Sequence, residues 1–277
     1  MKTIIAATDF TDESLNAVHY AAQLSADTSN KLMLLHTAQF SIIDHSLLER
    51  KKAVQRALED GAKDMVVLEG MLKKKHPDLE IDTTVREGVT LDILNELVEK
   101  HDVSAVVLSI RSSDTLYQAL FESTSVKVAG KVKAPVLIVP ATAKHEPIKK
   151  IVFAFDQKPI PMYTGIGFLK ELKHYYHAAF QYVNVLDSEF PKEDKSSLHS
   201  ILELLDEKEP DIRFLPSHKL NITDELTQHT QREHAQLLVM TSRKNKLFKK
   251  IFRQSQTRDI AYKSSIPLLV LAEELHN

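Results

Sequence analysis

The first half of the chain alternates short, continuously apolar runs with longer segments in which apolar residues recur every three or four positions. The short runs are typical of buried strands, and the longer spacing is typical of amphipathic helices. Apolar strands separated by helices predict a parallel sheet covered on both faces. The predicted strands are Thr3–Thr8, Leu32–Ala38, Glu80–Arg86, Ala105–Leu108 and Val136–Val139. One predicted helix begins at Asp12, and three others cover Leu47–Lys75, Leu91–Val98 and Thr115–Val132.

The second half of the chain repeats this order of elements. A run at Lys2–Asp9 opens the chain, and a similar run at Lys149–Asp156 opens the second half. A repeat of this length is too long for a solenoid and predicts two copies of one domain, residues 1–143 and 148–277. The predicted strands of the second copy are Ile151–Phe155, Phe180–Leu186, Asp211–Leu215, Leu237–Met240 and Leu268–Leu271. Its predicted helices lie near Tyr163–His174, Lys195–Lys208, Thr223–Glu233 and Lys246–Lys263. The second copy is shorter between its second and fourth strands, and we expect a shortened second helix there.

Composition narrows the class of protein. The chain has 277 residues, 43% hydrophobic and 27% charged, which is enough for two globular domains with their own cores. It has no cysteine, which excludes disulfides and thiolate metal sites and fits a cytoplasmic protein. A net charge of −2 gives no field that favours nucleic acid, and no apolar run is long enough to span a membrane. We therefore expect neither nucleic acid nor a membrane as a partner.

A basic run between Arg243 and Arg258 could be read as a nucleic-acid patch. The spacing of Leu247, Phe248 and Ile251 favours a different interpretation, in which the lysines form the solvated face of a helix.

Polar residues at the strand ends mark a candidate site. In an open parallel sheet, ligands bind beyond the carboxyl ends of the strands, where the strand order reverses. This places Thr8, Asp9 and Thr37 near a ligand in the first copy and Asp156 in the second. An aspartate after a buried first strand could accept a hydrogen bond from an adenine amino group or coordinate a cation. It could equally cap the next helix, and its presence in both copies favours a pocket without deciding the matter.

These features resemble the universal stress protein family. The resemblance rests on Asp9 after the first strand, Arg86-Glu87-Gly88 after the third and Pro135-Val136-Leu137-Ile138-Val139 at the close of the copy. It covers nearly the whole chain as two tandem domains and is stronger in the first copy. It implies in each copy a doubly wound, five-stranded parallel sheet of the Rossmann-like, adenine nucleotide alpha hydrolase-like type. It also implies that the domains pair as a pseudo-dimer within one chain, with Val136–Val139 antiparallel to Leu268–Leu271.

The resemblance weakens at the loop after the fourth strand. Nucleotide-binding members of the family carry Gly-x-x-Gly, nine residues, and then Gly-Ser or Gly-Thr, because glycines let backbone N–H groups approach a triphosphate. Here the spacing is kept, but every glycine is replaced. The positions read Ser109, Ser112, Glu122 and Ser123 in the first copy, and Thr241, Lys244, Gln254 and Ser255 in the second. A carboxylate such as Glu122 about 4 Å from a phosphate oxygen would cost roughly 4 kcal/mol at an effective dielectric near 20. In the second copy Arg243 and Lys244 would instead attract an anion.

Three functional hypotheses follow. The first is a cytoplasmic stress-response protein without turnover, a binding or sensing module whose ATP binding is weak or lost. The second is an adenine-nucleotide-binding protein that holds ATP or AMP mainly in the second domain and hydrolyses ATP slowly. The third is a small-molecule pocket between the domains. The candidate cofactor-binding residues are Thr8, Asp9, Thr37, Ser109, Ser112, Ser123, Asp156, Thr241, Lys244 and Ser255. Association of two whole chains into a homodimer stays open.

Overall fold

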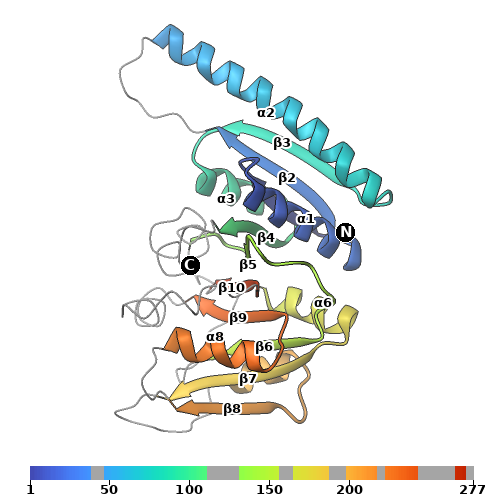
Figure 1. Cartoon of the computed structure of the whole chain (residues 1–277), viewed down its shortest axis with the longest axis vertical. Helices are drawn as coiled ribbons and strands as arrows, with labels where there is room; N and C mark the ends of the chain where they lie inside the picture. Colours follow the sequence, from blue (N-terminus) through green and yellow to red (C-terminus); the bar gives the residue numbers. More distant parts are fainter. Residues whose placement is uncertain are drawn as a thin grey trace.

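The computed structural model describes residues 1–38, 47–110, 131–155, 165–186, 198–216, 222–242 and 266–272. Figure 1 shows the elements in chain order. Those of the first half are β1 (Thr3–Thr8), α1 (Asp12–Asp27), β2 (Lys31–Ala38), α2 (Leu47–Lys75), β3 (Ile81–Glu87), α3 (Thr90–Lys100), β4 (Val103–Ile110) and β5 (Val136–Pro140). Those of the second half are β6 (Lys150–Ala154), α6 (Ile166–Tyr176), β7 (Ala179–Leu186), α7 (His199–Leu204), β8 (Asp211–Pro216), α8 (Ile222–Arg232), β9 (Leu237–Ser242) and β10 (Leu268–Ala272).

Most predicted elements are confirmed, including the long helix α2 with the predicted bounds. The shortening of the second helix is also confirmed, because α2 has 29 residues and its counterpart α7 has 6. The predicted helix Lys246–Lys263 lies outside the described residues. So does Thr115–Val132, except for its last two residues, which form a turn and a bend instead of helix.

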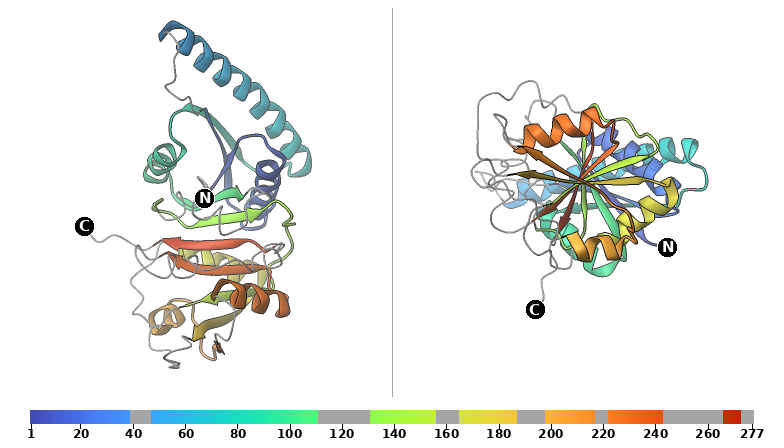
Figure 2. Two further views of the ribbon diagram at one scale, coloured as in Figure 1. Left: turned by 60° about the vertical axis from the view of Figure 1, so that its left-hand side comes forward. Right: turned by 90° about the horizontal axis from the view of Figure 1, so that it is seen from below.

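All ten strands belong to one continuous sheet with the order β3-β2-β1-β4-β5-β10-β9-β6-β7-β8. Each half is the predicted five-stranded parallel sheet, and its strand order reverses between its first and fourth strands. The halves join through β5 and β10, which run antiparallel with Leu269 opposite Leu137. The predicted pairing through the fifth strands is therefore confirmed. Seen from below, the strands fan out around the long axis, as expected when right-handed twist accumulates over many strands (Figure 2).

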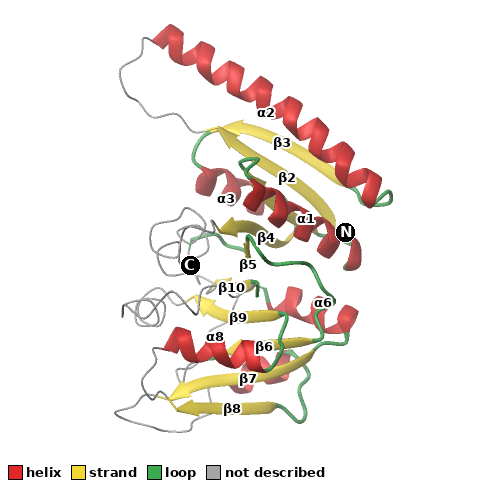
Figure 3. Ribbon diagram, viewed as in Figure 1, coloured by secondary structure: helices red, strands yellow, loops and turns green. Residues whose placement is uncertain are grey.

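Two hydrophobic cores lie on opposite faces of the sheet. Alternate strand residues point to opposite faces, so Ile4 belongs to the core that includes residues of α1, α2, α6 and α7, whereas Ile5 belongs to the core that includes residues of α3 and α8. Helices flank both faces in Figure 3. The first core includes residues of both halves, so the sheet and one helix layer both continue across the junction.

Helix α6 belongs to the second half but contacts the first. Lys2 Nζ forms an ion pair with Glu171 Oε1 at 2.7 Å, and the Tyr176 hydroxyl donates to Asp27 of α1. Asn16 of α1 holds the connecting segment by donating to the carbonyls of Pro140 and Ala143. Polar contacts thus support the junction that the backbone pairing makes.

Two glycines in this fold have opposite surroundings. Gly165, just before α6, has φ +104°, and an added Cβ would lie 2.7 Å from Cβ of Pro135 in the other half. Gly70, inside α2, has nothing within 4 Å of that position. A glycine inside a helix costs about 1 kcal/mol relative to alanine. Of these two glycines, Gly165 is therefore the one that the packing of the chain requires.

The substitutions Gly165→Ala and Gly70→Ala should change stability in opposite directions. Gly165→Ala combines an unfavourable backbone conformation with a steric clash, and should lower the free energy of unfolding by about 2 kcal/mol. Gly70→Ala should raise it by up to about 1 kcal/mol. Urea unfolding followed by circular dichroism measures both, and a change of the same sign in the two variants would contradict the packing described here.

Candidate functional site

The turn after β1 is stabilised by its own side chains. Thr11 is the N-cap of α1, and its hydroxyl accepts from the backbone N–H of Ser14 at 3.4 Å. Asp9 is exposed, and its Oδ1 accepts from the Thr11 hydroxyl at 2.6 Å and from the Thr11 N–H at 3.2 Å. The alternative in which Asp9 itself caps the helix is therefore wrong for the first copy, because Thr11 takes that position and Asp9 orients it.

The hydroxyl of Thr8 is also bonded within this turn. It lies 2.9 Å from the hydroxyl of Ser14 and accepts from the backbone N–H of Phe10 at 2.9 Å. Phe10 has φ 62°, a conformation that side chains other than glycine seldom adopt. The turn is thus held in an uncommon shape by hydroxyl groups at both of its ends.

His36, at the end of β2, closes this turn from the side. Its Nδ1 lies 2.8 Å from the carbonyl oxygen of Thr8, and since a carbonyl only accepts, Nδ1 carries the hydrogen. The ring lies 4.7 Å from that of Phe10 between centroids. Helix α2 covers it at Gly61, where an added Cβ would lie 2.8 Å from the His36 ring.

The end of β2 makes a second contact with the helix that follows β3. The hydroxyl of Thr37 lies 2.7 Å from that of Thr90, the first residue of α3. Thr37 is opposite Arg86 on β3, and the Arg86 guanidinium donates to Glu96 Oε2 at 2.7 Å. Arg86 first and Lys100 second lower the pKa of Glu96 to about 2. Arg86, which lies opposite Thr37 on the neighbouring strand, is therefore already paired with a carboxylate.

The second half reproduces the contact that His36 makes. Asn184, at the equivalent place on β7, donates from Nδ2 to the carbonyl of Phe155 at 2.7 Å, and both residues are buried. Phe155 directly precedes Asp156, as Thr8 directly precedes Asp9. In each half, a side chain from the second strand thus fixes the carbonyl before the aspartate.

The predicted site residues fall into two groups. Thr8, Thr37 and Ser109 lie at the carboxyl ends of β1, β2 and β4, which are neighbours in the sheet, and Thr241 is buried near the carboxyl end of β9. Ser112, Ser123, Asp156, Lys244 and Ser255 lie outside the described residues. His36 and Asn184 were not predicted, although their matching positions in the two copies were a usable signal.

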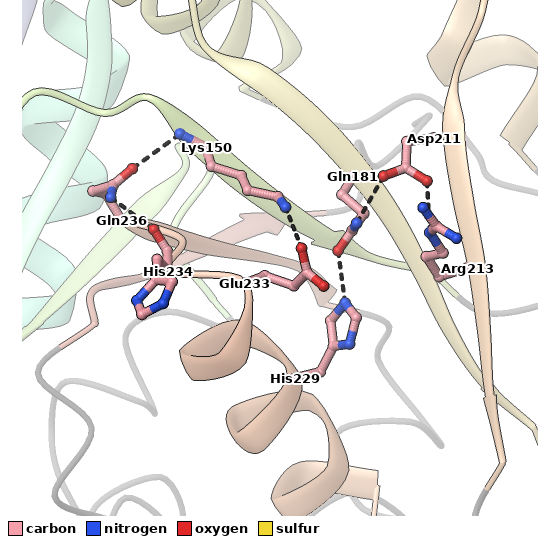
Figure 4. A network of polar contacts seen from close by, with 8 residues as sticks. All are labelled: Lys150, Gln181, Asp211, Arg213, His229, Glu233, His234 and Gln236. Carbon is pink, nitrogen blue, oxygen red and sulfur yellow. Dashed lines mark hydrogen bonds and ion pairs between the residues drawn. The ribbon is translucent and has the colours of Figure 1, made fainter.

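A separate polar network lies on the other side of the second half, near the amino ends of its strands (Figure 4). Gln181 Nε2 donates to Asp211 at 2.7 Å, which turns Gln181 Oε1 toward His229 Nε2 at 2.6 Å. His229 Nε2 therefore carries a hydrogen, and burial lowers the pKa of His229. Lys150 pairs with Glu233 beside it. Each of these groups has a structural partner, so the network links α8 to β6, β7 and β8.

A cleft of about 360 Å³ opens between the halves next to this network. Thr142 and Lys144 of the connecting segment line it together with His234 and Gln236 from the turn before β9. It lies at the amino ends of β9 and β10, whereas the predicted nucleotide site lies at the carboxyl ends. The cleft is thus a different place from the one that the strand-end residues mark.

Within the described ranges, no helix has the length and apolar character of a membrane span. The same ranges contain no group of three or more histidine, aspartate or glutamate side chains arranged to hold a metal ion.

Replacing Asn184 with leucine should destabilise the second half. Leucine has a similar size but no donor, so the buried carbonyl of Phe155 loses its partner, and the free energy of unfolding should fall by about 1–3 kcal/mol. In the first half, His36→Asn should lower the free energy of unfolding less than His36→Leu does, because asparagine makes this contact in the second half. Urea unfolding of the three variants tests this, and equal losses for His36→Asn and His36→Leu would contradict a role for the hydrogen bond.

Comparisons with known proteins agree with the fold. The model of the universal stress protein family matches residues 1–140. A universal stress protein from Archaeoglobus fulgidus DSM 4304 superposes with a TM-score of 0.66 at 12% identity, over 97% of this chain and 95% of that chain. A functionally unknown protein from Pseudomonas aeruginosa PAO1 superposes with a TM-score of 0.55 at 13% identity, over 99% of this chain and 93% of that one. No curated protein matches the sequence. The family match covers just over half of the sequence, and the chain belongs to the universal stress protein family.

Proposed function

We propose that this protein is a cytoplasmic stress-response module that binds or senses a partner without catalysis and holds ATP weakly or not at all. Its two units, residues 1–143 and 148–277, act as one body because they share a sheet.

The observation that carries the proposal is that polar groups at the candidate site are already bonded to one another. Asp9 accepts from Thr11, Thr8 is joined to Ser14, and Thr37 is joined to Thr90. A nucleotide that recruited these groups would have to replace existing hydrogen bonds, so its net gain would be small. The Phe10 and His36 rings further close the side of the turn that faces α2.

The loop sequence supports the same conclusion. Loss of all three glycines in each copy removes the close backbone approach that a triphosphate requires, and Glu122 adds a charge of the wrong sign in the first copy.

The alternative is a nucleotide site in the second half, with slow hydrolysis of ATP. Arg243 and Lys244 follow β9 directly and would attract phosphate, and Thr241 provides a hydroxyl at the strand end. Asp156 and Ser255 would complete the site.

Thermal denaturation with and without nucleotide distinguishes these functions. We expect no shift in Tm with millimolar ATP, AMP or either with Mg²⁺, since a ligand at 100 times its Kd stabilises by about 2.7 kcal/mol and would be seen easily. A clear shift in the wild-type protein that Lys244→Ala abolishes would establish the alternative.

A gain-of-function variant tests whether the missing glycines are the reason for weak or absent ATP binding. Restoring the family glycines in the first copy, with Ser109→Gly, Ser112→Gly and Glu122→Gly together, should create an ATP-dependent shift in Tm if lost backbone approach is the cause. The same protein with Glu122→Gln alone is the control for charge. If the triple variant folds and still shows no shift, the closed hydrogen bonds of the β1 turn are the stronger barrier.

A third hypothesis, a small-molecule site between the halves, is favoured by the cleft beside Lys144 and His234. Native mass spectrometry of the protein as purified should reveal a co-purifying ligand whose occupancy falls in His234→Ala. Retention of any such ligand by this variant would place it elsewhere.

A further inference from the structure

The outward face of α2 exposes apolar side chains that the fold does not use. Val66, Val67 and Met71 are 69%, 56% and 57% exposed, whereas Met65, Leu68 and Leu72 of the same helix are buried against the sheet. Figure 1 shows α2 beside β3 at one end of the long axis of the molecule, with no described element on its outer side. A cluster of large exposed apolar residues on one face marks an association surface more often than a chance arrangement.

Gly70 lies on this face, and no described residue packs against it. The other glycine of α2, Gly61, is required by the ring of His36, but an added Cβ at Gly70 would meet nothing within 4 Å. A helix-interior glycine weakens the helix, so its presence is accounted for when another backbone or a long side chain approaches there. Gly70 and the exposed valines thus point to the same partner contact.

The charges around this face match those of a second copy in the antiparallel direction. A two-fold axis between Val66 and Val67 pairs each residue with the residue that lies equally far along the helix on the other side of the axis. Val66 therefore lies against Val67 of the second copy. The same axis places Glu59 against Lys74 of the second copy. It also places Lys63, which is highly exposed, over the open space at Gly70.

A parallel arrangement would have the opposite electrostatics. It would place Glu59 near Glu59 and Lys74 near Lys74 of the second copy, and like charges at neighbouring helix positions repel. The antiparallel arrangement is therefore the one that both the charges and the glycine fit.

We propose that two copies of this chain associate through the outward faces of their α2 helices, packed antiparallel about Val66 and Val67. The proposal goes beyond the proposed function and does not depend on it. One helix pair buries less area than a standard interface, so the dimer should form with a Kd on the order of 1–100 μM.

Charge reversal gives the sharpest test. The variants Glu59→Lys and Lys74→Glu each place two like-charged pairs across the interface, and each should raise the dimer Kd at least about tenfold in sedimentation velocity experiments. An equimolar mixture of the two variants should recover association, because each pair then joins opposite charges. The double variant should also recover. Both positions are exposed, so the Tm of each variant should stay close to that of the wild type.

A steric variant provides a control of different chemistry. Gly70→Leu fills the open space and favours helix, so it should keep or raise the Tm while weakening the dimer. A wild-type chain that stays monomeric to about 300 μM, or a dimer insensitive to both charge variants and to Gly70→Leu, overturns the proposal. Failure of the mixed charge variants to associate also overturns it.

Discussion

The antiparallel pairing of β5 with β10 is the constraint on which the rest of the structure depends. Val136 and Val270 face each other across this pair with no exposed surface, so either strand alone would present an apolar, hydrogen-bonding edge. Because both strands belong to one chain, each edge meets its partner at a high effective concentration. The pairing then positions α6 against the first half, where Glu171 and Tyr176 find charged partners.

The two copies also share the way in which the turn after the first strand is fixed. In both halves the carbonyl before the aspartate is fixed by a side chain from the second strand, although one copy uses histidine and the other asparagine. The bond serves the turn itself, so it persists independently of any phosphate. The hydroxyls of Thr8 and Thr37 are likewise bonded within the protein, to Ser14 and Thr90. The same turn geometry is therefore reached with two different side chains.

Most of the fold could be predicted from the sequence because most strands are apolar runs and helices such as α3 have one apolar face. The bounds of α2 followed from this pattern alone. The bonds of the site could not be predicted, since Asp9 and Thr11 are both suitable caps and only the path of the turn decides between them. The contacts of His36 join residues distant in the sequence. The exposure of Val66 and Val67 could not be predicted either, because the sequence of a helix with apolar residues on two faces does not show which face meets the sheet.

Joining two domains in one chain also changes how the protein can associate further. The fifth strands are already paired, so their edges are no longer available to another molecule. Within the described part of the chain, α2 has 29 residues and α7, its counterpart in the second half, has 6. A self-complementary face that occurs once per chain can meet one second copy and is then used up, whereas a face on both halves would allow open chains of molecules. The asymmetry between the copies therefore limits association through α2 to a closed pair.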